Sequence, residues 1–263
     1  MKYRSLKAAV RRQWRDRKAP LVTYLILRSL VILTMIRQFM NRSYENVFLC
    51  FLTLLMLVMP ALIERRYRFE FPQLTEIILL LFVFSAEILG EINAFYIHFP
   101  HWDTILHTLN GFLCAALGFS LADLMNRSDA FSLKLSPGYQ ALMGFCFSMT
   151  IGVLWEFFEF GMDRFFFTDM QKDTVIRSFG SAMLDPSGAG KPVLVSGIDS
   201  VAVNGTDLGL GGYLDIGLID TMLDLLVNFI GALCFSICGY FYLKKGRAAA
   251  FIEQFISRAS EER

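Results

Sequence analysis

The stretch Trp102–Gly111, WDTILHTLNG, sets Asp103, His107 and Asn110 among apolar residues that predict a buried helix. Asp103 and His107 are four residues apart, so both side chains lie on one face of such a helix. Ionisable residues are costly to keep inside an apolar segment, and where they occur they indicate a functional site. The stretch therefore predicts a polar site inside a hydrophobic bundle, around which the other segments can be placed.

The composition indicates a polytopic membrane protein. Of the 263 residues, 55% are apolar, 14% are aromatic and only 19% are charged, which is not typical of a soluble domain. Membrane lipid is therefore an expected partner, and no nucleic-acid partner is expected. All five cysteines fall inside apolar runs, where we expect packing residues rather than a disulfide framework: Cys50, Cys114, Cys146, Cys234 and Cys238.

Apolar runs of about 17 to 25 residues predict membrane-spanning helices. Six such runs occur, at Pro20–Met40, Val47–Ile63, Leu74–Ile97, Trp102–Met125, Gly138–Phe160 and Ile216–Tyr242. The first run follows a basic lead, as in a secretory signal, but it is too long and lacks a small-residue cleavage site, so we expect it to be retained. The predicted fold class is an all-α polytopic transmembrane helix bundle of about six spans.

Lys and Arg residues outside these runs gather on one side of the predicted membrane. They occur in the N-terminal lead, between the second and third runs, between the fourth and fifth runs, and in the C-terminal tail. The positive-inside rule therefore places both termini in the cytoplasm of a multi-pass plasma-membrane protein. The expected order is a basic N-terminus (1–19), five spans (20–160), an extracytoplasmic loop or lid (161–215), a sixth span (216–243) and a cytoplasmic tail (244–263).

The long connection Gly161–Asp215 is rich in Gly, Ser and Asp. Its Val/Ile alternation around the pair Asn204-Gly205 indicates a short β-hairpin. Long connections of this kind are either functional lids or flexible surface loops. The position of this one above the predicted polar site favours a lid.

Two later runs repeat the device of the opening stretch, and a third acidic pair precedes it. At about 1.5 Å of rise per residue, the polar residues of these four helices fall into one band in the outer half of the membrane. We expect six of them to bind a divalent metal: Asp103, His107, Glu156, Glu159, Asp220 and Asp224. His107 and Glu159 are also the candidate catalytic residues, and Asn110, Asn228, Glu87 and Glu91 are expected to support the site.

Oxygen ligands with one imidazole suit Zn²⁺, Mn²⁺, Mg²⁺ or iron, and the lack of thiolates argues against a soft metal. Shared protons, a water-filled funnel or interhelical hydrogen bonding are the alternatives to a metal. His98 and His101 fall in a short outer turn and are expected to be solvated. Asp123 and Glu76 fall at cytoplasmic helix ends and are expected to be ordinary interface residues.

The pattern resembles the VanZ-like and YjdF-like integral membrane proteins of bacteria. VanZ-like sequences are similar in the Asp103/His107 pair and in D-x-x-x-N-x-x-G, matched by Asp224, Asn228 and Gly231. YjdF-like sequences are similar in W-E-x-x-E, matched by Trp155, Glu156 and Glu159, and in the paired acids Asp220 and Asp224. The Lys that often follows the first Asp in VanZ-like proteins is Thr104 here. The resemblance implies a cell-envelope location and, for VanZ itself, glycopeptide-antibiotic resistance.

Three functions are compatible with these features. The first is a metal-dependent hydrolase or transferase that acts on an envelope lipid or a lipid-linked phosphate, with His107 or a spare carboxylate as general base. The second is a proton- or cation-coupled transporter, which needs a polar path toward the cytoplasm. The third is a non-catalytic envelope protein that binds a lipid or an antibiotic through its long loop. A one-sided outer band of polar residues favours the first.

Overall fold

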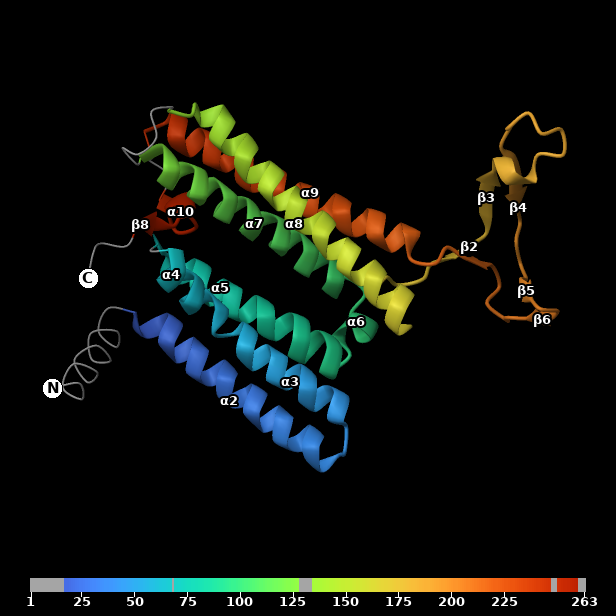
Figure 1. The fold of residues 1–263 in the computed structure, drawn as a ribbon, viewed down its shortest axis with the longest axis horizontal. Coiled ribbons are helices and arrows are strands. Elements are labelled where there is room, and N and C mark those ends of the chain that lie inside the picture. The colour runs from blue at the N-terminus through green and yellow to red at the C-terminus, as the bar shows by residue number, and fades with distance from the viewer. Residues whose placement is uncertain (1–16, 68, 128–133, 247–249, 260–263) are drawn as a thin grey trace. The chain divides into compact units, whose positions relative to one another are not determined.

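The computed structural model describes residues 17–67, 69–127, 134–246 and 250–259 (Figure 1). Residues 1–16 of the predicted basic N-terminus and residues 260–263 of the predicted tail lie outside these ranges. The chain divides into two units, which are described separately: unit 1 is Met1–Gly152 with Val227–Arg263, and unit 2 is Val153–Leu226. Both boundaries fall inside continuous helices.

Helices dominate the described residues, as predicted. They are α2 (Lys18–Met40), α3 (Tyr44–Met56), α4 (Met59–Tyr67), α5 (Gln73–Phe84), the π-helix η1 (Ser85–Ile92), α6 (Phe95–His98), α7 (Trp102–Arg127), α8 (Pro137–Phe166), the short η2 (Ala182–Leu184), α9 (Leu218–Lys244) and α10 (Ala250–Glu253). Five helical stretches are long and apolar enough to cross a membrane: α2, α3 with α4, α7, α8 and α9. The all-α polytopic prediction is therefore confirmed.

The third predicted run is not one regular helix. After α5 the chain continues as η1, an eight-residue π-helix, and then turns through Ala94, whose φ is 56°. Gly90 allows this course because a Cβ there would lie 2.3 Å from the ring of Tyr96. The Nδ2 of Asn93 donates to the carbonyl of Ile88 and closes the end of η1 at 2.6 Å.

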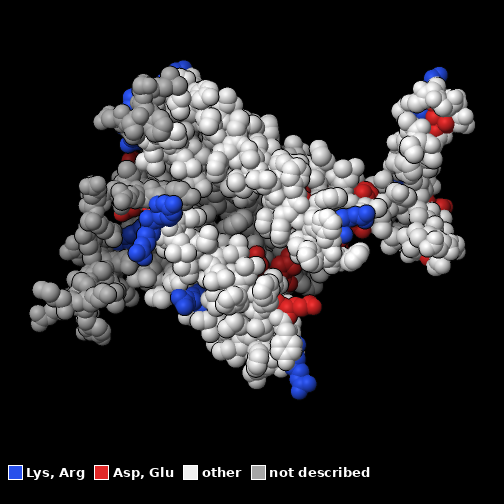
Figure 2. Space-filling model, viewed as in Figure 1, with Lys and Arg blue, Asp and Glu red and all other residues white. Residues whose placement is uncertain are grey.

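In unit 1, α2, α3 and α5 lie side by side (Figure 1). Their shared core contains Val31 and Cys50, both fully buried, with Leu80 and Ile88. The cysteines of the described residues are all free thiols, as predicted. On the face drawn in Figure 2 the helices carry mainly uncharged side chains. Exposed Leu33 and Phe48 belong to this apolar surface, which suits a lipid environment.

Within unit 1, α7 packs closely against the inner parts of α8 and α9 through glycines. A Cβ at Gly111 would lie 2.1 Å from the carbonyl oxygen of Asn228, and one at Gly231 would lie 2.0 Å from that of Thr108. The hydroxyl of Ser148 on α8 donates to the carbonyl of Gly111 at 2.8 Å. Close backbone approach at small residues is the usual way for membrane helices to associate.

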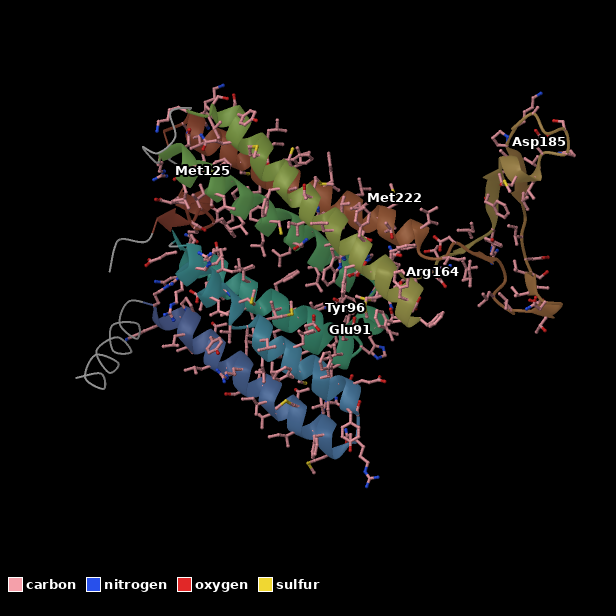
Figure 3. The ribbon with its side chains drawn as sticks, viewed as in Figure 1. Glu91, Tyr96, Met125, Arg164, Asp185 and Met222 are labelled. Carbon is pink, nitrogen blue, oxygen red and sulfur yellow. The ribbon has the colours of Figure 1, made fainter. Side chains whose placement is uncertain are left out.

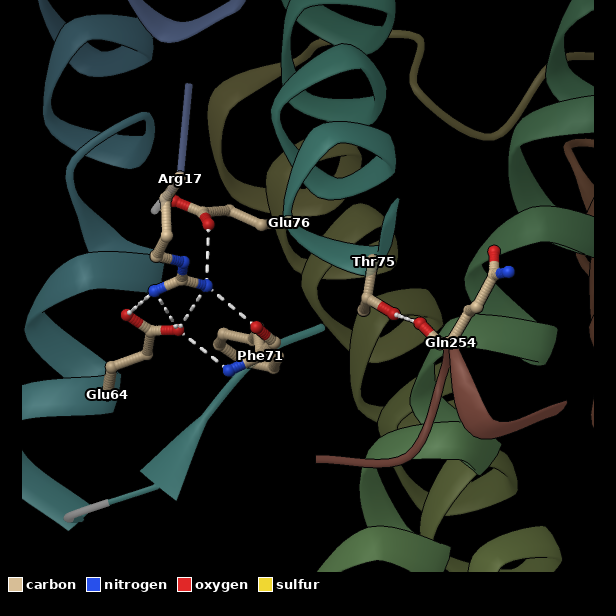
Figure 4. Close-up of polar contacts among 6 residues, drawn as sticks. All are labelled: Arg17, Glu64, Phe71, Thr75, Glu76 and Gln254. Atoms are coloured by element: carbon tan, nitrogen blue, oxygen red, sulfur yellow. Dashed lines mark hydrogen bonds and ion pairs between the residues drawn. The ribbon is translucent and has the colours of Figure 1, made fainter. Parts of the chain in front are cut away.

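Arg17 anchors the end of unit 1 at which α2 begins (Figure 4). Its guanidinium lies 3.1 Å from a carboxylate oxygen of Glu64 and 2.8 Å from one of Glu76, and it donates to the carbonyl of Phe71 at 2.7 Å. Burial acts to lower the pKa of Arg17, but the hydrogen bond to Glu64 and the two carboxylate charges outweigh it and raise the pKa. This network joins α2, α4 and the start of α5.

The C-terminal segment returns to the same end of unit 1 instead of leaving it as a solvated tail. Ile252, Phe255 and Ile256 are buried. The strand β8 (Arg258–Ala259) pairs antiparallel with β1 (Phe69–Glu70). The hydroxyl of Thr75 on α5 also donates to the carbonyl of Gln254 at 2.7 Å (Figure 4).

Unit 2 contains the end of α8, the start of α9 and the long connection between them. The connection forms three small antiparallel pairs, from β2 (Val175–Ile176) with β7 (Tyr213–Leu214), β3 (Ser178–Ser181) with β4 (Val193–Ser196), and β5 (Ala202–Val203) with β6 (Thr206–Asp207). The predicted hairpin at Asn204-Gly205 is confirmed, because both residues have positive φ (51° and 81°) between the paired Val203 and Thr206.

Asp185 orders the turn between β3 and β4, near the tip of that hairpin (Figure 3). Its carboxylate accepts hydrogen bonds from the side chain and backbone of Ser187 and from the backbone of Lys191. These bonds lower the pKa of Asp185 to about 2. The connection is therefore a built structure in the described residues rather than a featureless loop.

We expect Gly231→Ala to lower the free energy of unfolding by about 2 to 3 kcal/mol, because the new methyl group would overlap a backbone carbonyl that cannot rotate away. Unfolding of the detergent-purified protein by heat would measure it. Gly138→Ala is the matched control, since a Cβ there meets nothing within 4 Å. Equal losses in the two variants would contradict the close helix contact.

We expect Arg17→Ala to cost about 1 to 3 kcal/mol, because it leaves Glu64 and Glu76 without their shared cation in a site that is only partly exposed. The neighbouring Lys18→Ala removes an exposed charge and should change stability by less than about 0.5 kcal/mol. Denaturation of both variants beside the parent protein tests this. An unaltered Arg17→Ala variant would mean that the network contributes nothing.

Candidate functional site

Asp103 and His107 meet at the start of α7, the end of the helix opposite Arg127. The Nε2 atom of His107 lies 3.5 Å from a carboxylate oxygen of Asp103, and the His107 ring is buried. The indole N–H of Trp102 donates to the carbonyl of Ser85 in η1 at 3.3 Å and so fixes the first turn of α7. The predicted same-face pair is therefore a carboxylate–imidazole pair in the structure.

The separation within this pair fits two ligands of one ion. It exceeds the 2.7–3.2 Å of an ordinary N–H···O bond. Two atoms about 2.1 Å from a tetrahedral Zn²⁺ lie about 3.4 Å apart, close to the observed value. A carboxylate oxygen and an imidazole nitrogen are also ligands that such an ion accepts. The pair therefore meets the geometric requirement for part of a metal site.

A pair of amides lies one helical turn deeper in unit 1. Asn110 Nδ2 donates to Asn228 Oδ1 at 3.3 Å, and Asn228 is almost completely buried. Gly152 on α8 leaves room for the amide, since a Cβ there would lie 2.7 Å from Asn228 Nδ2. The Cys114 thiol donates to Asn110 Oδ1 at 3.4 Å. These contacts fix the register of α7 against α9 just below His107.

Unit 2 holds the predicted acids of α8. Glu156 and Glu159 are both buried, with 4% and 7% of their surface exposed. The indole N–H of Trp155 donates to a carboxylate oxygen of Glu159 at 2.9 Å, from four residues earlier in the same helix. The motif W-E-x-x-E therefore has a physical basis, because its Trp orients its second Glu.

The two aspartates at the start of α9 differ in their surroundings. Asp220 Oδ2 accepts from the backbone N–H of Lys172 in the connection at 2.7 Å. The side-chain N–H of Gln171 reaches the hydroxyl of Thr221 at 2.5 Å. Asp224 is buried, with 5% exposed, and lies four residues before Asn228 in the same helix. Asp220 thus anchors the connection, whereas Asp224 belongs to the buried face.

Asp163 and Asp215 also anchor the connection, and they were not among the predicted site residues. Asp163 accepts from the backbone N–H groups of Met170 and Gln171, and Asp215 accepts from those of Thr174 and Ile219. An acid just before an apolar helical run is a known N-terminal signal, which could have identified Asp215. Burial, with the charges of Asp169, Asp215 and Asp163, raises the pKa of nearby Asp173.

The remaining predicted residues fall into two groups. Glu87 is half-buried and Glu91 exposed on η1, and Figure 3 shows Glu91 beside Tyr96. A π-helix is often found at a functional site. The interface residues behave as expected, since buried Asp123 pairs with Arg127 at 2.7 Å and Glu76 pairs with Arg17. His98 and His101 are exposed, also as expected.

Comparison with known proteins gives one family and one relative. A family model described as "Predicted membrane protein (DUF2238)" matches residues 22–245. An uncharacterized protein of Thermotoga maritima is 30% identical over 105 residues, which are 40% of this chain and 52% of that protein. The chain thus spans about half the length of the curated relative it matches. No solved structure matches the chain.

The protein is embedded in a membrane, in agreement with its five apolar helices. Because the family model covers more than half of the sequence, the chain belongs to the DUF2238 family of predicted membrane proteins.

Proposed function

We propose that the protein holds a divalent metal ion with Asp103, His107 and Asp224 and acts as a hydrolase or transferase on an envelope lipid or a lipid-linked phosphate. The observation that carries the proposal is the 3.5 Å separation of Asp103 and His107 at the start of α7. Among the described residues, these three form the group of acids and histidine that could hold one ion together. Glu156 and Glu159 are further candidate ligands.

The amide pair supports the inclusion of Asp224. Asn110 contacts Asn228, and the two helices run in the same direction from the polar end of the bundle. His107 lies three residues before Asn110, and Asp224 lies four residues before Asn228. One turn of helix on each side therefore brings both toward the same level, with Asp103 one further turn out.

A bound divalent ion would polarise a phosphoryl or acyl oxygen or lower the pKa of a water molecule. The protein's own residues would position the substrate and handle the proton. Glu159, oriented by Trp155, is the candidate general base, and His107 is the alternative. Asp220 serves in this proposal to hold the connection over α9, since it binds the backbone of Lys172.

The packing below the amide pair favours a one-sided site over a transport path. Phe119, Phe235, Ala115 and Ala232 are fully buried in the deeper half of unit 1. The hydroxyl of Ser120, buried among them, donates to the carbonyl of Ala116 in its own helix. A proton or cation relay would need polar side chains at this depth. The alternative of a coupled transporter is therefore less well supported.

The proposed location follows from the same topology. Lys and Arg gather at the end of the bundle away from Asp103, which the positive-inside rule assigns to the cytoplasm of a plasma membrane. Asp103 is the second residue of α7 and would then lie at the depth of outer-leaflet headgroups. The resemblance to VanZ-like and YjdF-like proteins agrees with a cell-envelope substrate.

We expect the detergent-purified protein to retain about one equivalent of a divalent metal after dialysis against a weak chelator, and the variants Asp103→Ala/His107→Ala and Asp224→Asn to lose it. Elemental analysis measures the content. Two matched controls should keep the metal: His101→Ala, which removes an exposed imidazole, and Asp220→Asn, whose carboxylate binds the connection. A metal-free parent protein, or equal metal in all variants, would refute the site.

We expect Glu159→Gln to lower turnover of a lipid phosphate by about 10²- to 10⁴-fold with the metal retained, because general-base catalysis contributes that much. Trp155→Phe should cause a smaller loss and shift the pH profile, since it removes only the orienting hydrogen bond. Phosphate release from a polyprenyl diphosphate in mixed micelles is the assay. Asp169→Asn, an exposed change in the connection, is the control. Full activity in Glu159→Gln would assign the base elsewhere.

A further inference from the structure

The groove at the Arg17 end of unit 1 is filled by the chain's own C-terminal segment. Ile252, Phe255 and Ile256 expose only 5%, 5% and 3% of their surface. They share one apolar cluster with Phe119 of α7 and Phe235 of α9. Partly buried side chains of α5 pack against the same cluster. Three membrane helices therefore contribute to the groove that receives this segment.

The segment reaches far into the bundle. The ring of Phe255 packs edge-on against that of Phe112, with centroids 5.0 Å apart. Phe112 lies 15 residues before Arg127, the last residue of α7. At 1.5 Å per residue this is about 22 Å along the helix, more than half of a hydrocarbon core about 30 Å thick. The amide pair at Asn110 begins directly beyond.

The backbone of the segment is bound at several points, as irregular backbone at membrane depth requires. The N–H of Ser257 donates to the buried hydroxyl of Ser120 at 3.0 Å, and the carbonyl of Gln254 accepts from Thr75 at 2.7 Å. Strand β8 pairs with β1, and Phe71 beside β1 is bound by Arg17 and Glu64. The Arg17 network therefore also fastens the C-terminal segment.

We propose that residues Ala250–Ala259 are a plug that closes the bundle from the membrane face bearing the basic residues. The plug excludes water and solutes below the amide pair, so that polar residues at the start of α7 are reached only from the opposite face. It is independent of the metal, since none of its contacts involves Asp103, His107 or Asp224. Loosening the plug opens a water-filled path on the basic side.

The test uses the full chain, with its five cysteines replaced by alanine and a probe introduced by Ser120→Cys. A membrane-impermeant maleimide is added to vesicles of each orientation. In the parent probe protein we expect slow labelling from both sides. With Phe255→Ala added, labelling from the basic side should rise more than about tenfold, a change of 1.4 kcal/mol in the closing equilibrium, and labelling from the other side should not.

Phe251→Ala is the matched control, because it removes the same ring from a position that is 62% exposed on the same short helix. We expect less than a twofold change in labelling. Fast labelling of the parent probe protein from the basic side, or identical rates with Phe255→Ala and Phe251→Ala, would overturn the plug.

A second measurement needs no cysteine replacement and covers the case in which a variant does not fold. Hydrogen–deuterium exchange of the native protein in detergent should be slow in the peptide that contains Ser257, because its amide is buried and bonded to Ser120. Exchange as fast as that of an exposed coil would overturn the proposal. Loss of metal with slow exchange retained would refute the proposed function and leave the plug intact.

Discussion

The contact on which the rest of this protein depends is the close approach of α7 and α9 at Gly111 and Gly231. Each glycine faces a backbone carbonyl of the other helix at a distance that leaves no room for a Cβ atom. In a membrane, where lipid chains are as apolar as the helices, such backbone proximity and a few hydrogen bonds replace the hydrophobic effect as the source of association. The contact also brings Asn110 to Asn228, and through them sets the level of the polar residues one turn above.

Below that level the bundle is filled twice over, first by its own aromatic core and then by the C-terminal segment. Phe112 illustrates this, since its ring meets Phe235 of α9 and Phe255 of the segment, both edge-on. A membrane protein that gathers carboxylates at one end and closes the other end with packed aromatics is suited to chemistry at a surface. It is poorly suited to conduction, which needs polar groups along the whole path.

The parts of this structure that the sequence could predict are those with a strong local pattern. The helices α2, α7 and α9 lie within a few residues of their predicted bounds because long apolar runs end there at charged residues or turns. The pairing of Asp103 with His107 follows from their spacing alone. The binding of Asp220 to Lys172 could not be predicted, because it joins residues separated by a long connection. The C-terminal segment did carry a signal, since Ile252, Phe255 and Ile256 follow helical spacing, but its destination depends on a groove made by three other helices.

The π-helix η1 has a consequence for how the sequence can change. A π-helix holds one more residue in each turn than an α-helix, so it stores an insertion within an otherwise helical path. Removing one residue from Ser85–Ile92 would let this stretch rewind as an ordinary α-helix, and everything after it would rotate by about 100° relative to α5. Glu91, the turn at Ala94 and the Trp102 anchor would then face new directions. The face that this part of the protein presents to the polar end of α7 is therefore set by a count of residues as much as by their identity.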